Sequence, residues 1–224
     1  MRMPHLAAAA ALTLALAPIA AGAAPVHFTL NNIEVTANTG QGLIISTQPV
    51  GLPRNFDLTA GGPGVSFELF RIWTPESSLD LDDVLSQAFN LQLKFTAPLP
   101  GFTSDVGGST DGQLVFGGFL NLLTAGRGVL DWTASPIDLG FSSNAGSGIL
   151  RVTLDDASFN RGHFQYFGSG INPGEASGTT VSASFALVSF TPVPEPASMA
   201  LLGAGLLGLA LQQRPRRRRQ RAEA

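Results

Sequence analysis

Residues 89–96 read Phe-Asn-Leu-Gln-Leu-Lys-Phe-Thr, and this stretch indicates how the body of the protein folds. Its apolar and polar residues alternate strictly, so a strand built from it has one apolar face and one polar face. Strands with one buried and one solvent-exposed face are typical of antiparallel sheets. The same alternation recurs within residues 149–154 and 180–190. The pattern therefore predicts an all-β protein made of antiparallel sheets.

Other short apolar runs are separated by Gly, Pro, Asn and Asp, as in strands joined by turns. The sequence predicts nine strands, at residues 26–30, 42–46, 65–72, 89–96, 113–119, 129–133, 149–154, 163–167 and 180–190. We find no fixed repeat period, which argues against a β-helix. We expect residues 24–190 to form one antiparallel β-sandwich of the jelly-roll or immunoglobulin-like type. Residues 79–89 are expected to include a short helix with Ser78 as its cap.

The N-terminus has the features of a secretory signal. Arg2 supplies a positive charge, residues 6–19 are apolar, and Ala21-Gly22-Ala23 fits the small-residue cleavage rule. We expect a signal peptide over residues 1–23, which is removed on export.

The C-terminus reads Val193-Pro194-Glu195-Pro196, followed by an uncharged apolar run over residues 197–211. Together with two glutamines, this run predicts one transmembrane helix over residues 197–213, short for a bilayer. An arginine-rich tail over residues 214–221 follows. Its arginines are expected to stop transfer and to hold the C-terminus on the cytoplasmic side, and they include Arg214, Arg216, Arg217, Arg218 and Arg219.

The order of these three parts resembles the PEP-CTERM sorting signal of Gram-negative bacteria, with Pro194, Glu195 and Pro196 as the sorting motif. The resemblance covers residues 191–224 and none of the body. It implies recognition and cleavage by an exosortase, a membrane-embedded transpeptidase, and an association with exopolysaccharide, biofilm and the cell surface. The protein would then be a single-span inner-membrane precursor before processing, and a cell-surface or extracellular protein afterwards.

Charge and cysteine content exclude several functions. The body holds six of the thirteen basic residues and fourteen of the sixteen acidic ones, a net charge of −8. An acidic body repels nucleic acid. The chain has no cysteine, which excludes thiol nucleophiles and cysteine-ligated metal sites.

Few residues of the body are candidates for metal binding or catalysis. Asp80, Asp82 and Asp83 are weak calcium candidates, because calcium needs six to eight oxygen ligands, and the first turn of a helix is the favoured interpretation. Two histidines remain in the body, His27 and His163, each expected to be structural. No serine-hydrolase elbow, zinc or nucleotide motif is present. We expect no cofactor and no enzymatic activity.

The favoured hypothesis is an exported surface or extracellular-matrix protein, associated with exopolysaccharide or biofilm. One alternative is a carbohydrate-binding or adhesive module, in which Trp73, Trp132 or Tyr166 stacks on sugar rings. An ice-binding module is a variant of that alternative. A secreted hydrolase with an unrecognised site is the other alternative.

Overall fold

The structure is a computed structural model, and it describes residues 24–37, 42–118, 122–193 and 203–208. The predicted signal peptide, residues 1–23, lies outside this range. Within it, the chain is mostly β-strand, with a 3-10 turn η2 (Glu175–Ser177) and a short helix at residues 203–208. The strands are β1 (Val26–Ala37), β2 (Ser46–Pro49), β3 (Arg54–Leu58), β4 (Val65–Trp73), β5 (Gln87–Ala97), β6 (Phe102–Gly117), β7 (Leu123–Trp132), β8 (Ile137–Ser143), β9 (Gly146–Leu154), β10 (Ala157–Phe159), β11 (Gln165–Tyr166) and β12 (Thr179–Pro192).

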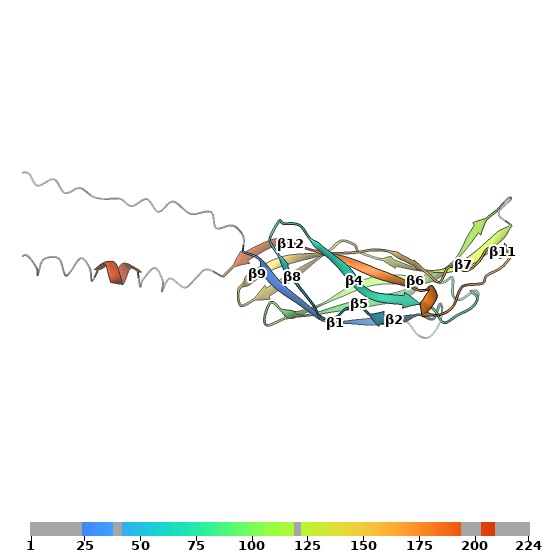
Figure 1. Cartoon of the computed structure of the whole chain (residues 1–224), viewed down its shortest axis with the longest axis horizontal. Coiled ribbons are helices and arrows are strands. Elements are labelled where there is room, and N and C mark those ends of the chain that lie inside the picture. Colours follow the sequence, from blue (N-terminus) through green and yellow to red (C-terminus); the bar gives the residue numbers. More distant parts are fainter. Residues whose placement is uncertain (1–23, 38–41, 119–121, 194–202, 209–224) are drawn as a thin grey trace, which may run out of the picture.

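The strands form two antiparallel sheets (Figure 1). The seven-stranded sheet has the order β10-β7-β6-β5-β1-β3, with β11 paired to β7. The five-stranded sheet has the order β2-β4-β12-β9-β8. The prediction of an all-β protein with antiparallel sheets is therefore confirmed.

The core lies between the two sheets, and the alternation seen in the sequence builds it. On β5, Phe89, Leu91, Leu93 and Phe95 are buried, while the residues between them are partly or fully exposed. The same alternation buries Val181 to Leu187 at every second position of β12, and Leu150, Val152 and Leu154 on β9. The hydrophobic effect thus fixes the register, because a slip of one residue would turn the apolar face to water.

Phenylalanine rings join the two layers. Phe185 of β12 lies 5.3 Å from Phe56 of β3 and 6.4 Å from Phe95 of β5, measured between ring centroids. Phe28 of β1 meets Phe141 of β8 edge to face at 5.3 Å. Each fully buried phenylalanine contributes about 1.5–3 kcal/mol through burial, and the ring pairs add a further increment.

Several boundaries differ from those predicted. Strands β3, β8 and β10 were missed; β3 and β8 begin directly after a proline, and β10 has only three residues. The predicted strand 42–46 overlaps β2 by one residue, and the predicted strand 163–167 shrinks to β11. Strand β12 runs two residues beyond the predicted end of the body.

The helix predicted within residues 79–89 was wrong, because residues 81–84 form turns. The amide of Leu85 donates to the carbonyl of Asp82, which closes a single turn. The carbonyl of Asp83 accepts the amide of Gly112 on β6 instead of continuing a helical ladder. Ser78 forms an isolated bridge with Gly170 and does not cap a helix.

Candidate functional site

The tail leaves the body directly from β12. The amide of Val193 donates to the carbonyl of Ala145 at 2.9 Å, one residue before the predicted sorting motif. The motif itself, Pro194 to Pro196, and the arginines from Arg214 to Arg219 lie outside the described residues. Residues 203–208, inside the predicted transmembrane segment, are helical. In the part of the chain that the structure describes, we find no helix with the length and apolar character to cross a membrane.

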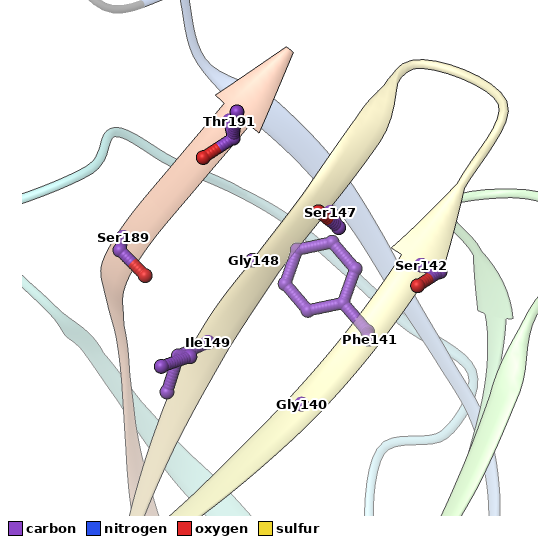
Figure 2. A pocket seen from close by; sticks show the side chains of 8 residues that line it. All are labelled: Gly140, Phe141, Ser142, Ser147, Gly148, Ile149, Ser189 and Thr191. Carbon is purple, nitrogen blue, oxygen red and sulfur yellow. The ribbon is translucent and has the colours of Figure 1, made fainter. Parts of the chain in front are cut away.

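A hydroxyl-lined hollow of about 340 Å³ lies on the five-stranded sheet, beside the end of β12. Ser142, Ser147 and Thr191 are register partners across β8, β9 and β12. Gly140, Ile149 and Ser189 form the next row. Figure 2 shows how the hydroxyl side chains come from three neighbouring strands. Hydroxyls both donate and accept hydrogen bonds, so the hollow suits a neutral polar ligand. This hollow was not predicted, because Ser189 and Thr191 are brought beside the β8–β9 residues only by strand pairing.

The three aspartates proposed as weak calcium candidates lie together in the turn before β5. Carboxylate oxygens of Asp80, Asp82 and Asp83 lie within 4.8 Å of one another. Asp83 is buried, and its Oδ2 accepts the amide of Asp80 at 2.8 Å. A hydrogen bond between Asp80 and Asp82 raises the pKa of Asp80 and lowers the pKa of Asp82. The opposite directions of the two pKa shifts follow from the hydrogen bond that joins the two carboxyl groups.

Glu76 belongs to the same acidic group, which the sequence did not indicate. Its Oε1 accepts the amide of Ile44 at 3.2 Å, while its Oε2 is buried without a hydrogen-bond partner. Burial raises the pKa of Glu76, and the nearby charges of Asp83 and Asp80 add to that rise. Oxygens of Asp83 and Glu76 already accept backbone amides, which leaves this group fewer free oxygens than the six to eight that a calcium shell requires.

The two histidines lie apart. His27 on β1 pairs with Asp57 on β3, with Nδ1 and Oδ1 2.8 Å apart and both side chains exposed. His163 precedes β11, which pairs with β7. Strands β5 and β6 separate β1 from β7 in the sheet. The two histidines therefore do not share a site.

The outer face of the seven-stranded sheet carries a second hollow, of about 210 Å³, between β6, β7 and β10. Gln113 and Arg127 are register partners, and Arg127 Nη2 donates to Gln113 Oε1 at 2.9 Å. Asp131 and Ser158 also line this hollow. Burial raises the pKa of the neighbouring Asp111, and the charge of Asp131 adds to that rise, whereas Gln113 and Arg127 oppose it.

Aromatic side chains continue the same outer face toward β11. Gly117, Leu123 and Tyr166 are register partners on β6, β7 and β11. The Phe164 ring lies directly over Gly117, where an added Cβ would come within 2.8 Å of it. Tyr166 is 74% exposed. Of the aromatic residues named from the sequence, Trp132 is instead in the core, where its indole N–H donates to the carbonyl of Asp155 at 3.0 Å.

The described fold is a β-rich body whose last strand leads straight into a C-terminal tail, which is the organisation of a protein with a terminal sorting segment. Residues 192–218 match the family model of the PEP-CTERM protein-sorting motif. The chain therefore carries this motif at its C-terminal end, and the motif marks it as an exported protein that an exosortase sorts at the membrane for the surface. No curated protein and no solved structure matches the chain.

Proposed function

We propose that this chain is a non-enzymatic surface or extracellular-matrix protein, whose body is a single β-sandwich domain over residues 24–190. The observation that carries the proposal is the sorting-motif match at residues 192–218, which begins where β12 ends. The body is then presented outside the cell, where it serves in an exopolysaccharide matrix or biofilm.

The proposed topology follows from the two ends of the chain. A cleaved signal peptide over residues 1–23 sends the body outward, and a short apolar segment over residues 197–213 halts transfer. The arginines after it resist entry into hydrocarbon, at a cost of several kcal/mol each. Glu195, held between two prolines, then stands at the outer surface within reach of an exosortase.

Intact-mass analysis of the protein from a host with and without its exosortase tests this proposal. We expect the mature species to lack Arg216–Arg219 only when the exosortase is present. Replacing Pro194, Glu195 and Pro196 with alanine should leave the precursor in the inner membrane. The matched control is Gln212→Ala, which changes the tail outside the Pro194–Pro196 tripeptide and should be processed normally. If the surface protein from the host with the exosortase still contains Arg216–Arg219, the proposed cleavage of the tail is refuted.

The absence of enzymatic activity is supported by the arrangement of the histidines. Among the described residues, histidine pairs with a carboxylate at one place, His27 with Asp57, on an exposed sheet surface. General-base chemistry needs a nucleophile within hydrogen-bond reach of such a pair. Thr29 Oγ1 is 3.5 Å from His27 Nε2 but donates to Asn55 at 2.8 Å, so it is a poor nucleophile.

A carbohydrate-binding module is the second candidate function. The specific observation in its favour is the exposed Tyr166 ring beside Phe164, on the same sheet face as the polar hollow at Gln113 and Arg127. Exposed aromatic rings next to planar polar side chains suit ligands that have both apolar and hydroxylated faces.

A further inference from the structure

We propose that the outer face of β6, β7, β10 and β11 binds a neutral polysaccharide chain. Tyr166 stacks on one sugar ring, while Gln113 and Arg127 hydrogen-bond to the hydroxyls of another. This inference rests on the second candidate function, which it deepens by naming the site and the ligand class.

The polar part of the site is already organised. The hydrogen bond between Arg127 and Gln113 fixes both planar groups at the floor of the hollow. Asp131 and Ser158 at the rim add acceptors and a hydroxyl. Fixed planar donors and acceptors lose little entropy on binding a ligand.

The aromatic part lies farther along the same strands. Arg127 and Leu123 are four residues apart on β7, and Leu123 is the register partner of Tyr166. At about 3.3 Å per residue, the polar and aromatic parts are roughly 13 Å apart. A single sugar cannot reach both parts, whereas a chain lying along the strands can. Phe164 is held between Gly117 beneath it and the guanidinium of Arg161, 5.5 Å from its ring centroid.

Charge selects a neutral chain over an acidic one. Asp131 and Asp156 line the hollow and Asp111 lies next to it, whereas Arg127 is the cation among the lining residues. The body as a whole also carries a net charge of −8. A uronic-acid polymer would bring carboxylates against this field, whereas neutral hydroxyls can donate to the aspartates.

The position of the face also suits a matrix ligand. Strands β7 and β11 lie at the end of the body remote from the start of β1 and the end of β12 (Figure 1). The tail therefore leaves from one end, and the proposed site stands at the other.

Affinity gel electrophoresis of the exported protein tests the proposal. The gels contain neutral polysaccharides (hydroxyethyl cellulose, xylan or dextran), with polygalacturonate as the acidic counterpart. We expect at least one neutral polymer to retard the wild-type protein and polygalacturonate not to. Tyr166→Ala and Gln113→Ala should each weaken retardation by roughly tenfold in dissociation constant, the size of a hot-spot contact.

Phe116→Ala serves as the matched control, because it removes an aromatic side chain that is 61% exposed on the opposite face of β6, and it should bind as the wild type does. Ser147→Ala tests the rival location, the hydroxyl-lined hollow on the other sheet. If the neutral chain binds at the outer face of β6 and β7, this variant should be retarded as strongly as the wild type. Retardation that survives Tyr166→Ala and Gln113→Ala, or is lost in Ser147→Ala, overturns this site alone. No retardation by any neutral polymer, or stronger retardation by polygalacturonate, overturns the neutral-glycan proposal, while the mass test of sorting is unaffected.

Discussion

Replacing Asn160 with alanine should destabilise the body strongly, because this buried side chain joins three segments. Its Oδ1 accepts the amide of Thr74 at 2.9 Å, just beyond β4. Its Nδ2 donates to the carbonyls of Asn172 and Gly174. The residue also adopts φ of 53°, in the left-handed region that asparagine tolerates better than alanine.

The size of the loss follows from these contacts. Thr74 is fully buried, so its unpaired amide would cost about 1–3 kcal/mol. Alanine in the left-handed conformation adds about 1–2 kcal/mol. With the two carbonyls also unpaired but partly reachable by water, we expect a total of about 3–5 kcal/mol. Asn160→Gly removes the same hydrogen bonds without the backbone strain, so it should lose about 1–2 kcal/mol less.

Urea unfolding of the exported protein, followed by tryptophan fluorescence and circular dichroism, measures these differences. Asn144→Ala is the matched control, since Asn144 lies exposed in the turn between β8 and β9. It should unfold at the wild-type midpoint. An Asn160→Ala protein within about 1 kcal/mol of wild type, the value of one ordinary hydrogen bond, would refute the reasoning. Equal losses for the alanine and glycine variants would refute the backbone part of it.

Three further outcomes are expected. Phe185→Ala should cost about 3–5 kcal/mol in urea unfolding, because Phe185 is fully buried between the sheets; a loss below that of a surface variant would contradict the described core. Gly128→Ala should cost about 1–3 kcal/mol, because its Cβ would come 2.3 Å from the Phe159 ring, and an unchanged midpoint would show that the ring moves freely. The raised pKa of Glu76 means that the native state binds the proton more tightly, so stability falls as the pH rises from 4.5 through the folded pKa. Glu76→Gln should flatten that decline in melting temperature, and identical slopes would count against it.

The sequence predicts best those strands in which apolar and polar residues alternate in step with burial. In residues 89–96 every second residue is apolar, and the structure buries these residues on one face of β5. Strand β8 escaped prediction although Ile137, Leu139 and Phe141 alternate with exposed positions, because three apolar residues are a weak signal without the partner strand β9. The turn at Asp80 was predicted to be a helix start, because acidic residues are common in both structures. The segment forms a turn because the Asp83 carbonyl accepts the amide of Gly112, which is distant in sequence, instead of an amide of a helix.

The candidate sites also differ in how far the sequence can predict them. A sorting motif is a contiguous peptide, so its letters are sufficient to recognise it. The polar and aromatic outer face joins Gln113, Arg127 and Tyr166, whose proximity depends on strand pairing. Tyr166 could be named from the sequence as a possible sugar-binding residue, but its neighbours could not.

The central position of β12 has a mechanical consequence. This strand is hydrogen-bonded on one side to β4 and on the other to β9, and it continues directly into the tail. The ladder bonds run perpendicular to the strands, so a pull on the tail along the axis of β12 loads them together, in shear. The bonds cannot open one after another, as they would at a peeled edge. A tether attached to β12 is therefore resisted by the hydrogen bonds to both neighbouring strands of the five-stranded sheet. The body should withstand tension from the cell side without unfolding from its C-terminus.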